Sequence, residues 1–578
     1  MLTQMTANKG IKNFGERAIA AILKEYGQLN KLSVFGSLDP ESLSHEEKRK
    51  ALRAINLIKQ KRCGKIKART CADGRPQRSY VSRDEAASPT VSMEALLTTL
   101  AIDAKEKRDV AVFDVPSAYL HAEMPASKKV LIKLEDKFVD IMCQVNPRYL
   151  PYVRTENKKK VLYLRVLKAL YGCIESALLW YNTYTSVLQK MGFELNRVDP
   201  CVANKVINGK QCTITWYVDD NKISHEDPSV VTDILSKMEA LYPGLTVSRG
   251  KKHKLLGMNI EFCDNGSLKI DTSEYVREAI EDFGEDVRKK VTSPAAHGLF
   301  QIDLESPPLS KKKSDVFHSV VAKLLWVMKR GRPDIETTIA FLCTRVKCPT
   351  CQDWCKLRRL ISFLYDTIDD NRIIGADNLL TLLTWIDAAY AVHNNMRSHT
   401  GGAISMGLGV LHARSSKQRL NTKSSTEAEV VGVSDYLPYN LHFVMFLREQ
   451  GYTVRKNVLF QDNESAIKME TNGRMSCTSN SKHVDVRYFF VKDRVDKREI
   501  EIRHCPTTKM VADYFTKPLQ GALYHKLRRI IMGWDHITAL EDKDHVSASE
   551  ERVVKLSNGE STENKNVSWV DIVKGERS

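Results

Sequence analysis

With 578 residues, the chain is too long for a single hydrophobic core, and its length predicts roughly three or four domains. A formal net charge of +17 at pH 7 predicts a polyanionic partner, first a nucleic acid and second an acidic membrane surface. Thirteen scattered Cys argue against a disulfide framework, and the lack of a signal peptide or membrane-length apolar run predicts an intracellular protein without a membrane-spanning segment.

The first two thirds of the chain divide into three predicted regions. Residues 1–62 are expected to be helical and charged, with Asp39 as an N-cap and Pro40 at the first helical position. Strand-like runs such as "VAVFDV", "KVLIKL" and "KVLYLRVL" alternate with helical runs over residues 63–270. Helical patterns dominate residues 271–375.

The remaining third divides into two further predicted regions. Residues 376–520 begin with the strand "LLTLLTWID" and contain a long helix near 425–450. Residues 521–578 are expected to form a C-terminal helix, followed after Trp534 by a polar tail with the composition of a disordered segment.

One strand-like run, "QCTITWYVDDNKISH", ends in two adjacent carboxylates. Ile214, Trp216 and Val218 alternate with the side chains of the other face, which predicts a half-buried strand. Asp219 and Asp220 then favour a turn, and "KISH" a returning strand. The pair is either a solvated hairpin tip or a metal site, because two like charges side by side repel unless something relieves them.

Further motifs give this hairpin a context. Upstream, Asp114 closes the strand "VAVFD", and a Gly-bearing loop in "LYGCIESALLWY" leads into an amphipathic helix. An acid at a strand end, a Gly loop with a helix, and "YVDD" on a hairpin resemble, in this order, the palm of a copia-type LTR retrotransposon reverse transcriptase. "GKIKARTCADGRPQR", "KLLGMNI" and "FHSVVAKLLWVMKRGRPDI" extend the resemblance, which covers roughly residues 60–520.

The resemblance implies a polymerase site. Asp114 and Asp219 are expected to be catalytic ligands of Mg²⁺ or Mn²⁺, with Asp220 as the supporting acid. Two such ions stabilise the attacking and leaving oxygens of an in-line displacement, and they prefer carboxylate oxygens. The residues expected to bind the nucleotide are Lys67, Arg69, Tyr119, Gly172, Ser176 and Tyr217.

Each nucleotide-binding role has a structural alternative. Tyr119, expected under the incoming sugar as a barrier to a 2′-hydroxyl, is otherwise a core aromatic. Ser176 is otherwise a helix cap, and Lys67 and Arg69 belong otherwise to a solvated face. Ala177 stands where the family has Pro, which puts the detailed shape of that loop in doubt.

A second set of acids follows in the C-terminal region. Asp387 ends a strand, Glu427 begins a helix in "SSTEAE", Asp462 ends another strand, and Asp513 lies in "ADYFTKPL". With "KHVD", these motifs resemble a copia-type RNase H. Carboxylates from four separate elements, without Cys or His, are typical of catalytic Mg²⁺ or Mn²⁺ sites and not of Zn²⁺ sites.

These acids also have structural alternatives. Glu427 fits a capping box with Ser424, Asp462 a turn, and Asp513 a solvent-facing position. The sequence departs from the family at Ala389, where an Asp is usual. It departs again at residues 507–509, which read Thr-Thr-Lys in a loop where some RNases H carry a mobile His.

Two other features are expected to be structural. His504 is interpreted as a strand residue. Cys348, Cys351 and Cys355 have a spacing that could bind Zn²⁺ or an iron–sulfur cluster, but no second Cys or His pair follows, and an ordinary helix start is favoured.

Together these observations predict an α+β multidomain protein with reverse-transcriptase fingers and palm, a helical thumb and connection, and an RNase H-like domain. The predicted function is RNA- and DNA-directed DNA synthesis coupled to RNase H cleavage, by a portion of a copia-type polyprotein. An inactive remnant that only binds nucleic acid is the alternative. Expected partners are an RNA template, a DNA primer, their hybrid and dNTPs. The implied location is cytoplasmic, in virus-like particles, and the oligomeric state is left open.

Overall fold

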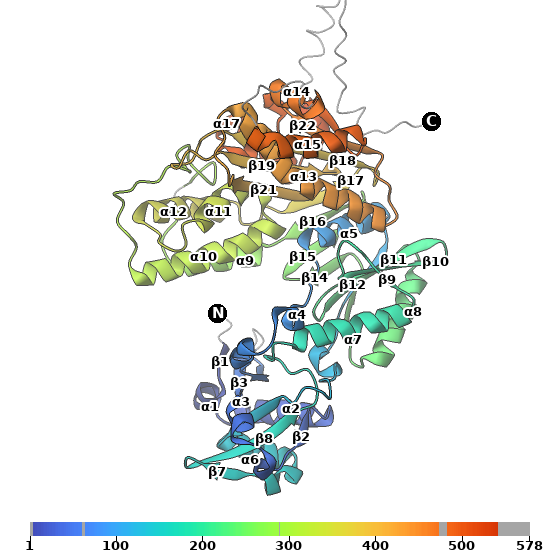
Figure 1. Cartoon of the computed structure of the whole chain (residues 1–578), viewed down its shortest axis with the longest axis vertical. Coiled ribbons are helices and arrows are strands. Elements are labelled where there is room, and N and C mark those ends of the chain that lie inside the picture. Colours follow the sequence, from blue (N-terminus) through green and yellow to red (C-terminus); the bar gives the residue numbers. More distant parts are fainter. Residues whose placement is uncertain (1–3, 61–63, 288–289, 473–481, 542–578) are drawn as a thin grey trace, which may run out of the picture.

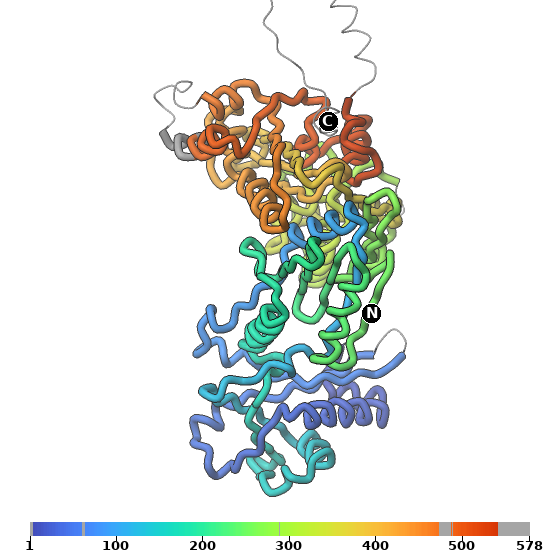
Figure 2. Tube along the Cα trace, turned by 90° about the vertical axis from the view of Figure 1, so that its right-hand side faces the viewer, coloured from blue at the N-terminus to red at the C-terminus, as the bar shows by residue number. Residues whose placement is uncertain are grey.

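The computed structural model describes residues 4–60, 64–287, 290–472 and 482–541, without the side chains of 482–486 and 488. The expected tail after residue 541 lies outside this part. Sheets and helices follow one another along the longest axis, with the N-terminal sheet at one end and the C-terminal sheet at the other (Figures 1 and 2). This arrangement confirms an α+β multidomain fold.

The N-terminal, or fingers, sheet has the order β1-β3-β6-β8-β2, with β4 added on β3 and β7 on β8. Its strands are β1 (Gln4–Thr6), β2 (Phe35–Ser37), β3 (Leu52–Gln60), β4 (Ile66–Ala72), β6 (Leu131–Glu135), β7 (Arg154–Glu156) and β8 (Lys159–Val166). Its helices are α1 (Ala7–Phe14), α2 (Glu16–Lys31), η1 (Pro40–Ser42), α3 (His45–Lys50), α6 (Lys137–Val145) and η4 (Pro147–Tyr152). Helices α1 and α2 share one hydrophobic core with this sheet.

The helical prediction for residues 1–62 is wrong for its last part. Asp39 caps Pro40 as expected, but the element that follows is a short 3-10 helix. Residues of β3 pair with both β1 and β4, and Asn56 and Ile58 are buried on one face with strand periodicity. Strand pairing therefore overrides the helical propensity of this charged segment.

The central, or palm, sheet has the order β13-β5-β12-β11-β10-β9. Its strands are β5 (Asp109–Asp114), β9 (Glu194–Leu195), β10 (Val202–Ile207), β11 (Lys210–Tyr217), β12 (Asp220–His225) and β13 (Thr246–Arg249). The helices of this region are η2 (Arg75–Ser79), α4 (Arg83–Ala86), α5 (Met93–Lys105), η3 (Ala118–His121), α7 (Ser176–Lys190) and α8 (Pro228–Leu241).

A third sheet joins the palm to the C-terminal part, in the order β14-β15-β16-β17-β20. Its strands are β14 (Lys252–Leu255), β15 (Met258–Phe262), β16 (Ser267–Asp271), β17 (Arg372–Ala376) and β20 (Gly407–Leu408). The helices inserted between β16 and β17 are α9 (Ser273–Phe283), α10 (Lys311–Arg330), η5 (Pro333–Ile335), α11 (Glu336–Cys343) and α12 (Cys351–Asp366). The predicted dominance of helices in this segment is confirmed.

The C-terminal sheet has the order β21-β19-β18-β22-β23. Strands β18, β22 and β23 pair in parallel, while β19 pairs antiparallel with both β18 and β21. Its strands are β18 (Thr381–Ala389), β19 (His399–Ser405), β21 (His412–Lys417), β22 (Lys456–Gln461) and β23 (Glu501–His504). Its helices are α13 (Ser425–Glu449), α14 (Glu464–Asn472), α15 (Lys482–Asp496), η7 (Thr507–Lys509), α16 (Asp513–Thr516), α17 (Gly521–Ile531) and η8 (Ile537–Leu540).

The palm and the C-terminal domain share one hydrophobic core, which includes Ile223 of the palm and Tyr436 of α13. The prediction of a half-buried β11 is therefore wrong, because Thr213 and Thr215 on its second face are buried too. Thr213 bonds to Gln450, at the end of α13, over 3.4 Å. Within the described part of the chain, no helix is long and apolar enough to cross a bilayer.

Candidate active sites

The two acids of "YVDD" lie at the tip of the hairpin formed by β11 and β12. Tyr217 pairs with Asp220 on the last rung, so Val218 and Asp219 form the turn. Val218 has φ +61°, which is unfavourable for a β-branched residue. The Trp180 indole of α7 donates a hydrogen bond to the Val218 carbonyl over 2.7 Å, which helps to hold this strained turn.

The hairpin brings its acids to Asp114 at the end of β5. Asp114 is the direct cross-strand partner of Asp220, and the Val115 amide donates to the Asp219 carbonyl over 3.1 Å. Burial and the charge of Asp219 raise the pKa of Asp114, while Lys67 opposes this shift. Burial, Asp219 and Asp114 raise the pKa of Asp220 to about 6. The three carboxylates thus form one electrostatic cluster that a bound cation would stabilise.

Candidate nucleotide-binding residues surround this cluster. The Arg69 guanidinium lies 4.2 Å from the Tyr171 ring centroid, and Tyr171 packs on Tyr119 with centroids 4.8 Å apart. Burial and the charge of Asp219 raise the pKa of Tyr119, which places its phenol near the acids. Lys67 lies on the same exposed face of β4 as Arg69. These cations and rings therefore border the hairpin acids.

The other candidates differ in position. Tyr217 is 40% exposed at the rim of the hairpin. Ser176 is only 1% exposed and its hydroxyl donates to the Leu170 carbonyl over 2.6 Å, so its observed role is internal. It is the first residue of α7 and not its N-cap. A Cβ on Gly172 would lie 2.0 Å from the Ala72 carbonyl oxygen, so this glycine allows close packing against the end of β4. The contacts of Ser176 and Gly172 are therefore internal to the protein, and they account for these residue types without a bound nucleotide.

Helix α2 also contributes to this site, although no sequence motif predicts it. Glu25 accepts a hydrogen bond from the Thr70 amide over 3.0 Å, on the strand that carries Lys67 and Arg69. Burial raises the pKa of Glu25, and those two cations oppose the shift. Gln28 donates to the Ser117 hydroxyl, three residues after Asp114, over 2.6 Å. Nothing in the local sequence signals these contacts, because they join segments far apart in the chain.

A buried charge network lies under the hairpin. Lys222 of β12 is fully buried and forms an ion pair with Asp103 of α5. Arg108 lies 3.9 Å from Asp103 and donates to the Tyr452 hydroxyl over 3.0 Å. Tyr452, just beyond α13, also donates to Glu106 over 2.6 Å. The network therefore connects the β11–β12 hairpin to the C-terminal domain.

A second acid cluster lies in the C-terminal domain. Asp387 lies near the end of β18 and Asp462 follows the parallel strand β22, so the same sheet edge carries both. Asp513 begins α16. Ligand atoms of these three residues all lie within 4.8 Å of one another, which is found for no other His, Cys, Asp or Glu trio in the described residues.

The electrostatics of this cluster favour a bound cation. Burial and Asp387 raise the pKa of Asp513 to about 7, and the same two causes raise the pKa of Asp462. Lys517 partly compensates, with its ammonium 2.7 Å from Asp513 and 3.6 Å from Asp387. Oxygen-only donors with this much repulsion fit a hard divalent cation.

The fourth acid of this cluster is Glu429, and the prediction of Glu427 is corrected. The Glu427 carboxylate accepts a hydrogen bond from the Lys423 amide over 2.8 Å, at the start of α13. Its own amide donates to Ser424, so the capping alternative describes its contacts. Glu429 is 5% exposed, and burial together with Asp387 and Asp462 raises its pKa. Residues two apart on a helix point to different sides, which separates the two roles.

The remaining sequence features are structural in the described chain. Ala389 lies within β18, and Thr507 donates to Asp462 over 3.3 Å from the loop where a His is expected in some relatives. His504 ends β23, as predicted. Cys351 begins α12 as expected, and Cys348, Cys351 and Cys355 are all exposed free thiols. The backbone of "KHVD" begins α15, and its side chains lie outside the described residues.

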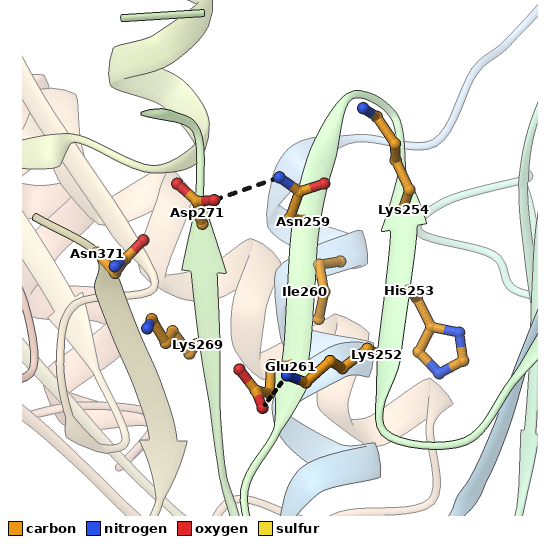
Figure 3. A pocket seen from close by; sticks show the side chains of 9 residues that line it. All are labelled: Lys252, His253, Lys254, Asn259, Ile260, Glu261, Lys269, Asp271 and Asn371. Atoms are coloured by element: carbon orange, nitrogen blue, oxygen red, sulfur yellow. Dashed lines mark hydrogen bonds and ion pairs between the residues drawn. The ribbon is translucent and has the colours of Figure 1, made fainter. Parts of the chain in front are cut away.

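A groove of 410 Å³ lies on the third sheet, apart from both acid clusters (Figure 3). Lys252 pairs with Glu261 over 3.1 Å, and Asn259 donates to Asp271 over 3.2 Å. Lys254, also in the groove, pairs with Glu274 over 3.2 Å. Acidic residues therefore neutralise most of the positive charge of this groove, which makes it a weak anion site.

Comparisons with known proteins agree with the hairpin geometry. Residues 43–297 match the family described as reverse transcriptase (RNA-dependent DNA polymerase). The chain is 24% identical over 460 residues to the retrovirus-related Pol polyprotein from transposon TNT 1-94 of Nicotiana tabacum, covering 78% of this chain and 33% of that protein. It is 26% identical over 542 residues to the transposon Ty1-DR5 Gag-Pol polyprotein of Saccharomyces cerevisiae, covering 89% and 29%.

The chain thus spans about a third of the length of these curated relatives. Among solved structures, native prototype foamy virus protease-reverse transcriptase aligns with a TM-score of 0.24 at 12% identity, over 86% of this chain and 54% of that one. The family match includes Asp114, Asp219 and Asp220 and ends before the C-terminal acid cluster.

Proposed function

On the premise that residues 43–297 form the reverse transcriptase domain of a copia-type retrotransposon Pol polyprotein, we propose that this chain is an RNA- and DNA-directed DNA polymerase with an RNase H activity. The observation that carries the polymerase is the pairing of Asp114 with Asp220 beside the Asp219 turn. The RNase H activity is supported by the buried acids at the edge of the C-terminal sheet.

In the proposed polymerase reaction, the 3′-hydroxyl of a DNA primer attacks the α-phosphate of a dNTP and pyrophosphate leaves. Asp114 and Asp219 would hold divalent cations, Mg²⁺ or Mn²⁺, with Asp220 beside them. When bound, such cations stabilise the attacking and leaving oxygens. Lys67 and Arg69 neutralise the triphosphate, since guanidinium and ammonium groups bind phosphate oxygens strongly. The Tyr119 ring, backed by Tyr171, would lie under the sugar and clash with a 2′-hydroxyl.

In the proposed nuclease reaction, a water molecule attacks a phosphodiester of the RNA strand. Asp387, Glu429, Asp462 and Asp513 would supply the oxygen donors for divalent cations, and a bound cation would relieve the repulsion among these carboxylates. Lys517, already close to two of these acids, holds a positive charge where the scissile phosphate would approach. Thr516 donates to Asp387 and fixes the orientation of that carboxylate.

The substrate implied by both sites is an RNA template paired with a DNA primer. A polymerase must accept every sequence, so contacts to this hybrid would be mainly to phosphates, and binding should weaken with salt. The net charge of +17 supports such a substrate. We place the protein in the cytoplasm, within virus-like particles, as an extension of the same proposal.

The proposal is tested by Mg²⁺-dependent extension of a DNA primer on an RNA template. Wild type should extend the primer, and D219N should lose extension while still binding the hybrid. D264N is the matched control, because Asp264 is an exposed acid paired only with Lys251 in a neighbouring loop. If wild type binds the hybrid in a salt-sensitive way but does not extend the primer, the chain is a nucleic-acid-binding remnant and the proposed polymerase activity is wrong.

A further inference from the structure

One guanidinium near the polymerase hairpin lacks a counter-ion. Arg330, the last residue of α10, donates only to the Trp326 carbonyl, over 3.5 Å, and its Nε is buried without a hydrogen-bond partner. It forms no ion pair with the described residues. By contrast, Arg277 of α9, Arg358 of α12 and Arg345 between α11 and α12 each pair with a carboxylate. Arg330 is therefore available for an anion that does not belong to this part of the chain.

The position of Arg330 is fixed by a stack of aromatic rings. Its guanidinium lies 4.4 Å from the Trp326 ring centroid, and Trp326 stacks on Tyr275 at 3.9 Å. Both rings press on the turn between β14 and β15, where a Cβ on Gly257 would lie 2.8 Å from Tyr275 and 2.9 Å from Trp326. The Arg330 carbonyl accepts a hydrogen bond from the buried Arg372 over 2.7 Å. The cation is thus held in place and cannot swing freely into solvent.

This cation lies near the β11–β12 hairpin. Arg330 is within electrostatic reach of Tyr217, the residue that pairs with Asp220, and of Tyr275. Burial lowers the pKa of Arg330, and only the two phenols oppose the shift. Partial burial of an unpaired guanidinium is unfavourable, so a phosphate at this position would gain both charge compensation and hydrogen bonds.

We infer that Arg330 binds a phosphodiester of the primer strand close to its 3′ end, with Trp326 and Tyr275 as its support. The primer is the strand assigned because its 3′ end must reach the hairpin acids that Tyr217 adjoins. This inference rests on the proposed function and adds a specific residue and ligand group to it. The groove of Figure 3 does not compete for this role, because Lys252 and Lys254 already have acidic partners.

The test measures binding of a DNA primer annealed to an RNA template, by fluorescence anisotropy over a range of salt concentrations. R330Q should weaken binding about 3- to 10-fold and lower the slope of log Kd against log salt by about 1, because one phosphate contact is lost. R330K should retain the charge and part of the affinity. R277Q is the control. It removes an exposed guanidinium of α9 that is paired with Asp369, and its Kd and salt slope should match those of wild type.

A neutral methylphosphonate placed at successive positions of the primer locates the contact and does not depend on how well one variant folds. Wild type should lose affinity at one position near the 3′ end, R330K should lose less there, and R330Q should lose little or nothing further. Equal losses in wild type and both variants at every position, or an unchanged Kd and salt slope for R330Q, would overturn the inference. Because binding is measured without turnover, failure of extension by wild type contradicts the proposed function alone.

Discussion

The two acid clusters differ in how the chain builds them. The hairpin cluster joins adjacent strands of one sheet, and Asp114, Asp219 and Asp220 come together through a strained two-residue turn. The C-terminal cluster draws its acids from separate elements and buries Asp387 and Asp513 to 2% exposure. It also contains its own cation, Lys517, whereas the hairpin has Lys67 only at the edge. The first cluster can thus be predicted from a local sequence motif, whereas the second is brought together only by the tertiary fold.

The largest expected effect separates the two clusters by single substitutions. D219N should reduce primer extension about 10³-fold or more and leave RNA cleavage nearly unchanged, and D387N should do the reverse. Each removes a charge that its own site needs to hold a divalent cation. The measurement is a pair of assays on one hybrid, labelled on the primer for extension and on the RNA for cleavage. Loss of both reactions in either variant would mean that the sites are not independent.

A smaller effect should separate Glu429 from Glu427 within the C-terminal cluster. E429Q should lower RNA cleavage at least about 10²-fold, because its carboxylate faces Asp387 and Asp462. E427Q should cost about 1 kcal/mol of unfolding free energy through the helix start and keep the cleavage rate. The readouts are the cleavage rate and a denaturant melt for both variants. A larger loss of cleavage in E427Q would restore Glu427 as the functional acid.

The clusters should also differ in pH dependence at limiting Mg²⁺. The pKa of Asp513 is raised to about 7 and that of Asp220 to about 6. Protonation removes negative charge from each proposed cation site, so cleavage should decline as the pH falls through about 7, and extension only as it falls through about 6. Without metal, the raised pKa of Asp513 means that the folded protein is most stable when this carboxyl is protonated. The free energy of unfolding therefore falls as the pH rises toward 7. Saturating Mg²⁺ should shift both activity profiles to lower pH.

A matched variant checks this assignment. D513N should reduce the loss of metal-free stability between about pH 4 and about pH 7 without altering the profile of extension, and the raised pKa values of Asp462 and Glu429 account for the loss that remains. A stability curve that is unchanged in D513N would show that another group titrates there.

The difference between the clusters also decides what the sequence could predict. The hairpin can be predicted from the sequence because the strand periodicity, the turn residues and both acids lie within fifteen residues of chain. Asp387, Asp462 and Asp513 were readable as strand and helix ends in a known order. Glu429 was not, because the phase of α13 decides which of two nearby acids faces the sheet, and Glu427 carries the stronger local signal as a cap.

Other residues were hidden for the same physical reason. The segment 52–60 has helical composition but becomes β3 through pairing on both edges. Thr213 and Thr215 look solvent-facing but are buried, and Thr213 contacts Gln450 of the C-terminal domain. Glu25 and Gln28 act through contacts with segments distant in sequence. Local pattern therefore predicts elements and their ends, while burial from another domain is invisible to it.

The smallest expected effect concerns the link between the two clusters. The Tyr452 hydroxyl bonds to both Glu106 and Arg108, beside the Asp103–Lys222 pair under the hairpin. Y452F should cost about 1–3 kcal/mol of unfolding free energy, because buried charged groups lose a partner. Y365F, which alters a phenol that is 43% exposed, is the control.

Extension and cleavage rates in Y452F should stay within a few-fold of wild type, since no acid of either cluster changes. The informative readout is where the RNA is cut relative to the primer 3′ end. A rigid connection sets one spacing between the two sites along a bound hybrid, so wild type should give a narrow set of cuts and Y452F a broader one. An equally narrow set in Y452F, despite the loss of stability, would mean that the shared hydrophobic core fixes the spacing and that the charged network only stabilises it.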